Sequence, residues 1–289
     1  MGPLARAYGS AVAATLLWSS NVVAVKFALL ELPAFPTGLL RITLAAATLA
    51  LWHAFQRKPF SIRAGERWLF AQLGVAGIAW SFLFFTLALS YTSVAHAVFI
   101  GALVPAAVLL LARLEGQERF TLLKLAGMGI SLAGVLLLSL DQAGGMGASW
   151  KGDLLAIAGL WCFSFLTVRS KRAAAFYDSM SLNTYTFVIA AIFCLPFLVW
   201  QAPNIAWSRI TWVGWLSLLY SATLGSAGAY LAYYYSLRTL TASQVAAFQY
   251  VQPVLSTAFG VLFLAESWGA KFTVGAALIL AGVFLAERR

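Results

Sequence analysis

Charged residues are scarce in this sequence, and acidic residues are the scarcest of them. Only 10% of the 289 residues are charged, whereas 62% are hydrophobic and the mean hydropathy is +0.87. A soluble domain carries about 25% charged residues, so we expect lipid to be the solvent of this chain. The sequence also contains no Walker A, HExxH or GxSxG motif. It therefore gives no support to ATP-driven transport or to an intramembrane hydrolase, and we expect no enzyme.

Cysteine is rare as well. Cys162 and Cys194 lie within apolar runs, without CxxC spacing and without clustered histidines. We interpret them as small core residues and expect no disulfide, metal ion or cofactor. The net charge of +10 comes from Lys and Arg that stand singly or in twos and threes between apolar runs. That pattern is typical of residues flanking membrane spans, so we expect membrane lipid and no nucleic acid as a partner.

Ten apolar runs, each close to the roughly 20 residues that a membrane-spanning helix needs, follow one another with short connections. They do not alternate as the strands of a membrane β-barrel do. We predict an all-α membrane protein with ten transmembrane helices in a single domain over residues 1–289. The runs are 7–30, 34–56, 66–90, 92–112, 121–140, 150–171, 180–201, 209–236, 242–264 and 269–286.

The basic residues predict the orientation. If the N-terminus is placed on one side of the membrane, 14 of the 19 Lys and Arg residues fall on that side. The positive-inside rule then puts both termini in the cytoplasm. The other side has Lys26, Arg41, Lys151, Arg209 and Lys271.

The chain contains an internal repeat. At a spacing of 148 residues Pro105 matches Pro253, Glu118 matches Glu266, and AGV at 133–135 matches AGV at 281–283. We predict repeat one at 5–143, with helices one to five, and repeat two at 148–289, with helices six to ten. Because five is odd, the second repeat would run inverted across the membrane, as in many secondary transporters.

This plan resembles the EamA-type carriers of the drug/metabolite transporter superfamily. The resemblance rests on LLWSSN at 16–21, the two proline-centred helices, and the Gly-rich segments GMGISLAGV at 127–135 and GAALILAGV at 275–283. Within the superfamily the chain looks most like aromatic amino-acid exporters of the YddG kind, through its mid-membrane tryptophans and an aromatic, amide-bearing ninth helix. The resemblance implies a multi-pass transporter of the bacterial inner membrane that works by alternating access.

Candidate cavity residues are polar or aromatic and fall at mid-depth, where such a transporter binds its substrate. Trp18 and Trp161 are repeat-equivalent, and Trp80 is mid-helix; each would line a cavity or pack in the core. Asn21 and Ser164 lie one turn from the first two. Tyr230 and Tyr234 form a stripe that lines the cavity or packs in the core.

The ninth helix carries Gln244, Phe248 and Gln252 at i, i+4 and i+8. These side chains would form one stripe that lines the cavity or joins helices by hydrogen bonds. On the fourth helix His96, the repeat mate of Gln244, would relay protons or act as a hydrogen-bonded polar residue, and Phe99 shares its face.

Two further pairs leave alternatives open. Pro105 and Pro253 each remove a backbone donor within a span and would act as hinges or as fixed kinks. Lys26 and Arg41 lie near the external ends of their helices, where we expect their side chains to snorkel to the interface. In a sharper alternative, one of them meets a substrate carboxylate.

The distribution of charge predicts the substrate. All nine acidic residues fall in loops or at the ends of runs, so the central carboxylate typical of cation exporters is missing. We also expect no Lys or Arg at the centre of the membrane, which disfavours strongly anionic solutes. We expect a monomer that exports neutral, small-molecule metabolites, above all aromatic and other neutral amino acids. The alternatives are a multidrug exporter on the same fold, or a receptor or scaffold without transport.

Overall fold

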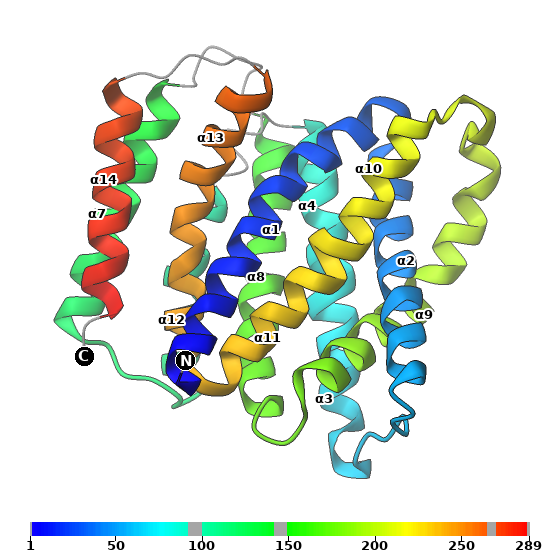
Figure 1. Cartoon of the computed structure of the whole chain (residues 1–289), viewed down its shortest axis with the longest axis horizontal. Helices are drawn as coiled ribbons and strands as arrows, with labels where there is room; N and C mark the ends of the chain where they lie inside the picture. The colour runs from blue at the N-terminus through cyan, green and yellow to red at the C-terminus, as the bar shows by residue number, and fades with distance from the viewer. Residues whose placement is uncertain (1, 92–99, 142–148, 265–269, 288–289) are drawn as a thin grey trace.

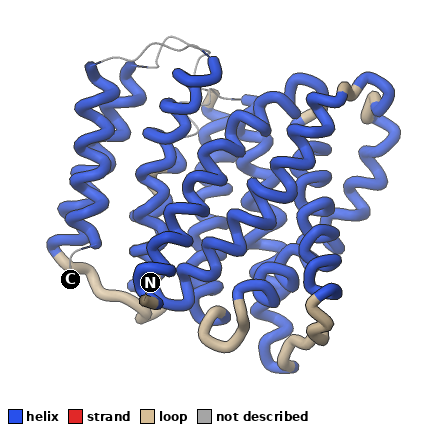
Figure 2. The backbone as a smooth tube through the Cα atoms, in the orientation of Figure 1, coloured by secondary structure: helices blue, strands red, loops and turns tan. Residues whose placement is uncertain are grey.

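The computed structural model describes residues 2–91, 100–141, 149–264 and 270–287, and within these ranges the chain is helical without a strand (Figure 2). The helices are α1 Pro3–Glu31, α2 Ala34–Phe55, α3 Arg67–Gln72, α4 Trp80–Tyr91, α6 Val104–Leu114, α7 Leu122–Asp141, α8 Trp150–Ala173, α9 Ser179–Gln201, α10 Trp212–Ala222, α11 Ala229–Thr239, α12 Ala242–Ala247, α13 Val251–Leu264 and α14 Ala270–Glu287.

Five helical segments are long and apolar enough to cross a bilayer. They are Pro3–Glu31, Ala34–Phe55, Ala64–Tyr91, Trp150–Ala173 and Ser179–Asn204. The all-helical membrane fold is therefore confirmed, whereas the total of ten spans stays a prediction. The first helix begins and the last one ends at the same end of the bundle, which we call the terminal face (Figure 1). The cytoplasmic location of that face also stays a prediction.

Helices α7 and α14 pack side by side through glycine (Figure 1). A Cβ atom added to Gly134 would come within 2.6 Å of the Gly275 carbonyl oxygen, and one added to Gly127 would meet the backbone of Gly282. Gly275 and Gly282 are the repeat mates of Gly127 and Gly134, and the pairing is crossed. The two equivalent helices therefore run antiparallel, which is the relation that an inverted repeat produces.

The two halves interlock elsewhere too. Helix α1 packs on α11, and α8, its counterpart in the second half, packs on α4, the counterpart of α11. Helices α2 and α9 form a second pair of counterparts in contact, besides α7 and α14. Each half thus places its first helix against the other half, and the core between them is shared.

Both halves contain a π-helical segment at the same place, η2 Leu73–Ala79 and η5 Thr223–Gly228. Such segments widen a helix locally and are frequent at functional sites. Gly225 in η5 lies so close to Asn21 that a Cβ atom at this position would overlap the amide.

The proline-centred helices differ from the prediction. We expected one continuous helix over 92–112 and another over 242–264. In the described part of the first, the helix is interrupted by a turn before Pro105, which lies in the first turn of α6. In the second, the 3₁₀ segment η6 Phe248–Tyr250 separates α12 from α13, where Pro253 lies. A proline at the start of a helix loses no hydrogen bond, and this explains both interruptions.

Candidate functional site

A cavity of about 170 Å³ lies between the two halves. Its described walls come from α1, α2, α4, α8, η5, α11, η6, α13 and residues 101–104. On α1 the lining residues run from Trp18 to Val25, and on α8 from Ala156 to Phe163, so they occupy the middle of the bundle and the half remote from the terminal face. Since a water needs only about 10–15 Å³ of such space, the cavity can hold a small solute.

Aromatic rings form much of the wall. The indole of Trp18 lies with its ring centroid 5.3 Å from that of Tyr230 and 5.7 Å from that of Phe163, both nearly edge-on. Phe82 lies 5.7 Å from Tyr230 on the same wall. Mostly apolar walls with a few polar groups are typical of small-molecule sites.

Arg41 is the charged residue on the described wall of this cavity. Its side chain is 5% exposed, and its guanidinium carbon lies 5.0 Å from the centroid of the Phe82 ring. One nitrogen, Nη2, donates to Ser226 Oγ at 3.4 Å, while Nε has no hydrogen-bond partner among the described residues. The expectation that Arg41 snorkels to the interface is therefore wrong, and so is the expectation that the centre lacks a cation.

Amides complete the polar part of the wall. Asn21 is 7% exposed, and its Oδ1 has no hydrogen-bond partner among the described residues. Gln249 and Gln252 also line the cavity, as does Ser81. No carboxylate lines the cavity within the described part of the chain.

The structure brings together five of the residues that the sequence singled out and places seven others elsewhere. Trp18, Asn21, Tyr230, Gln252 and Pro253 line the cavity. Trp80 stacks on Phe84 and is 37% exposed, Trp161 is 43% exposed, and neither lines the cavity. Ser164 and Tyr234 are buried but do not line the cavity, and neither does Pro105. His96 and Phe99 lie outside the described residues.

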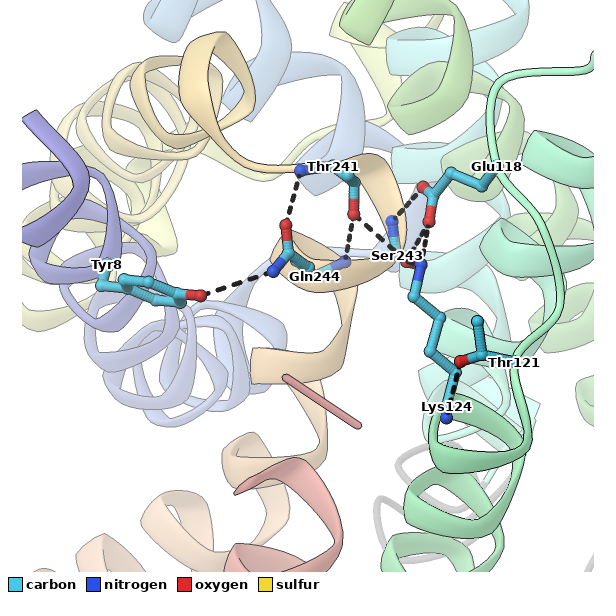
Figure 3. Close-up of polar contacts among 7 residues, drawn as sticks. All are labelled: Tyr8, Glu118, Thr121, Lys124, Thr241, Ser243 and Gln244. Atoms are coloured by element: carbon cyan, nitrogen blue, oxygen red, sulfur yellow. Dashed lines mark hydrogen bonds and ion pairs between the residues drawn. The ribbon is translucent and has the colours of Figure 1, made fainter. Parts of the chain in front are cut away.

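Gln244 and Phe248 lie near the two ends of α12 instead, and neither lines the cavity. The side-chain oxygen of Gln244 accepts from the backbone N–H of Thr241, and Thr241 Oγ1 accepts from the backbone N–H of Gln244, which makes a capping box (Figure 3). The Gln244 amide nitrogen donates to the hydroxyl of Tyr8 at 3.4 Å, and the Phe248 ring lies 5.9 Å from the Tyr8 ring. These contacts hold α12 against the beginning of α1.

Glu118 lies in the loop between α6 and α7, at the terminal face where α7 begins (Figure 1), and it joins the two halves (Figure 3). Its carboxylate forms an ion pair with Lys124 at 2.6 Å and accepts from both the backbone N–H and the hydroxyl of Ser243. Lys124 also donates to the Ser243 hydroxyl at 3.1 Å. Burial by itself would raise the pKa of Glu118, but the hydrogen bonds from Lys124 and Ser243 and the charge of Lys124 bring that pKa below its usual value.

The loop that carries Glu118 is fixed to α8 as well. Glu115 pairs with Arg169 at 2.6 Å, and the side-chain amide of Gln117 donates to the carbonyl of Val168 at 3.1 Å. We call these contacts and those of Glu118 the terminal-face network. None of its residues lines the cavity, so the network is separate from the cavity wall.

Sequence reasoning missed part of the wall, including Phe82, Phe163 and Gln249, and misplaced Arg41. A signal for Arg41 was present, because it lies seven residues after the start of α2 and thus roughly 10 Å along the helix. At that depth the Arg41 side chain is far from the interface to which it was expected to snorkel. No signal of this kind distinguishes Phe82 or Phe163 from the many aromatic residues around them.

The comparisons with known proteins agree with this architecture. The model of the EamA-like transporter family matches residues 5–140 and again residues 150–287. A protein named as an uncharacterized transporter from Archaeoglobus fulgidus is 28% identical over 93% of each chain. A probable terminal-alkyne amino-acid exporter from Streptantibioticus cattleyicolor is 23% identical over 99% of this chain and 95% of its own. A solved crystal structure superposes with a TM-score of 0.80 at 21% identity, over 97% of this chain and 96% of that one.

Proposed function

Because this chain belongs to the EamA-like transporter family, we propose that it is a secondary transporter that exports neutral amino acids, aromatic ones above all, across the cytoplasmic membrane of a bacterium. The observation that carries the proposal is the cavity between the two halves, with its aromatic wall and few polar groups. A transporter of this kind exposes such a central site to one side of the membrane and then to the other.

The composition of the wall supports an amino acid over a lipophilic cation. A cation exporter needs a carboxylate in its site to exchange for the proton or the drug, and the described wall carries an arginine instead. Trp18, Phe163 and Tyr230 offer ring faces and edges to an apolar side chain. The relative from Streptantibioticus cattleyicolor, a probable exporter of an amino acid, adds support of the same kind. The proposal includes that, within the family, this chain is functionally most similar to exporters of aromatic amino acids of the YddG kind.

Alternating access would use the terminal-face network as one gate. While Glu118 holds Lys124 and Ser243, the bundle is closed on that face. Its release would let α12 and the loop between α6 and α7 separate and connect the cavity to the terminal face. The interruptions next to Pro105 and Pro253, which border the cavity, would be the hinges.

The test is flux into liposomes that contain the purified protein. We expect uptake of labelled phenylalanine and tryptophan above that of empty liposomes, and little uptake of tetraphenylphosphonium. Absence of flux for every solute would leave a receptor or scaffold, and flux of the lipophilic cation alone would favour a drug exporter.

A matched pair of variants places the site. Trp18 and Trp161 are repeat-equivalent, but only Trp18 lines the cavity. We expect Trp18→Ala to lower phenylalanine flux about tenfold or more, through loss of ring contacts, and Trp161→Ala to keep most of it. Equal effects of the two substitutions would contradict the placement of the site in this cavity.

A further inference from the structure

We propose that Arg41 and Asn21 form the receptor for the head group of the substrate, with the guanidinium binding a carboxylate and the Asn21 oxygen accepting from an ammonium group. The substrates of the cavity are then α-amino acids with an apolar or aromatic side chain. The inference deepens the proposed function and rests on it.

The first argument is the state of Arg41. A buried guanidinium is costly and normally pairs with an acid or donates its N–H groups to several acceptors. Among the described residues Arg41 forms no ion pair, and it donates one hydrogen bond, to Ser226. The guanidinium also lies over the ring of Phe82. This cation lines a cavity large enough for a solute, so a carboxylate that enters the cavity supplies the missing counter-ion and accepts in the bidentate geometry that arginine favours.

The second argument is the position of Asn21. Arg41 contacts Ser226, and Asn21 lies against Gly225, the preceding residue of η5. The two residues are therefore held against adjacent residues of one π-helical segment, and both line the cavity. Each carries a buried polar atom without a hydrogen-bond partner among the described residues, a donor in Arg41 Nε and an acceptor in Asn21 Oδ1. An α-amino acid carries an anionic acceptor and a cationic donor on neighbouring atoms. Its head group matches this donor and acceptor, whereas a simple cation or a simple anion satisfies only one of them.

The third argument is what surrounds the pair. Phe82 lies beneath the Arg41 guanidinium, and its ring contacts Tyr230, which in turn contacts Trp18. A solute whose carboxylate is held at Arg41 would thus place its side chain against these rings. Burial of an aromatic side chain among such rings is favourable. Amino acids with a side chain as small as that of threonine would fill this space poorly. Amino acids with large apolar side chains are therefore expected to bind best.

The experiment measures binding and flux separately for the purified, reconstituted full chain. Binding is followed by quenching of tryptophan fluorescence with phenylalanine, phenylalaninamide and phenethylamine as the added solutes. The amide replaces the carboxylate, and phenethylamine lacks it. For the wild type we expect phenylalanine to bind about 10–100-fold more tightly than either analogue, the effect expected for loss of a charge-assisted hydrogen-bonded pair.

Three variants identify the residue. Arg41→Gln is expected to weaken phenylalanine binding by about 10–100-fold and to abolish the preference over phenethylamine. Arg41→Lys keeps the charge and should restore part of the affinity. Lys26→Gln is the matched control, since Lys26 is a basic residue that is exposed on α1 and does not line the cavity. Size-exclusion profiles and melting temperatures of all three establish that they are folded.

The outcomes separate this inference from the proposed function. If the wild type carries phenylalanine and Arg41→Gln carries and binds it equally well, the head-group receptor is refuted and the exporter stands. A wild type that binds phenethylamine as tightly as phenylalanine refutes it as well. A wild type that moves no amino acid above empty liposomes refutes the function, and the receptor with it.

Discussion

At the scale of single residues, the character of the site depends on which way each side chain points. Arg41 and Lys26 both lie near the ends of apolar runs that the sequence places on the side opposite the termini. Arg41 turns inward to the cavity, and Lys26 turns outward. Spacing along one chain gives depth along a helix, but the direction around the helix depends on what the neighbouring helices cover. The sequence could therefore predict the depth at which cavity residues lie, but only in part which residues at that depth face the cavity.

Gly225 offers a test of the Asn21 position. We expect Gly225→Ala to push the Asn21 amide away, because the new Cβ would overlap it, and to weaken phenylalanine binding about tenfold through loss of one hydrogen bond to a charged group. Gly228→Ala, in the same π-helical segment, is the control, since its Cβ would lie 3.5 Å from the nearest atom. Fluorescence titration of both variants gives the comparison, and a normal affinity in Gly225→Ala would count against Asn21 as a ligand.

Glu118 offers a test of the gate. Glu118→Gln removes the negative charge that binds Lys124 and Ser243. We expect the free energy that favours the closed state to fall by roughly 2–3 kcal/mol, so that the state open at the terminal face becomes populated. Ala246→Cys, buried on α12, in a background without Cys162 and Cys194, should then react faster with a maleimide. Lys58→Gln is the control, because the Lys58–Asp178 pair is largely exposed and contributes little. An unchanged labelling rate in Glu118→Gln would refute the gate.

The same carboxylate gives a pH dependence. Its pKa is lowered below the ordinary value of 4.5, so its contribution to closure is complete above about pH 4.5 and is lost as the pH falls through the lowered pKa. Labelling of Ala246→Cys with an acid-tolerant thiol reagent should therefore be flat from neutral pH down to about pH 5 and rise only below that. A rise centred near neutral pH would show that another group controls the face.

At the scale of helices, the repeat could be predicted and the interruptions could not. The match of Gly127 with Gly275 and of Gly134 with Gly282 indicated two equivalent helices, and the structure pairs them. The stripe of Gln244, Phe248 and Gln252, in contrast, assumed one continuous helix. The 3₁₀ segment at 248–250 has fewer residues per turn, so the residues before and after it no longer share a face. Gln244 consequently caps α12, while Gln252 reaches the cavity.

The glycine contact of α7 and α14 can be tested within one helix. Gly134→Ala would press its Cβ against Gly275 and Ile279 of α14, and we expect a loss of about 1–3 kcal/mol in the free energy of unfolding in detergent. Gly129→Ala, on α7 with no atom within 4 Å of the new Cβ, should be neutral or stabilising by up to about 1 kcal/mol. Denaturation curves of both variants supply the measurement, and equal midpoints would argue against close packing at this contact.

At the scale of the whole molecule, the described wall of the cavity contains neither a carboxylate nor a histidine, and this bears on the driving force. We expect phenylalanine to move down its own gradient, with an imposed pH gradient changing the initial rate by less than about twofold, since a proton-coupled carrier needs a titratable group in its path. Paired flux assays with and without the gradient decide this. A severalfold stimulation would require a proton-carrying residue and would direct attention to His96.

The packing of α1 against α11, a helix of the other half, also affects how the protein is synthesised. During synthesis α1 enters the membrane first, but the residues of α11 that cover it are made about 200 residues later, which is roughly 10–40 s at usual rates of translation. Throughout this interval the inner face of α1, with Asn21 among its residues, lacks its final neighbours. The nascent first half therefore needs the insertion machinery or a chaperone to cover this face. A chain truncated after residue 143 should be degraded by membrane proteases.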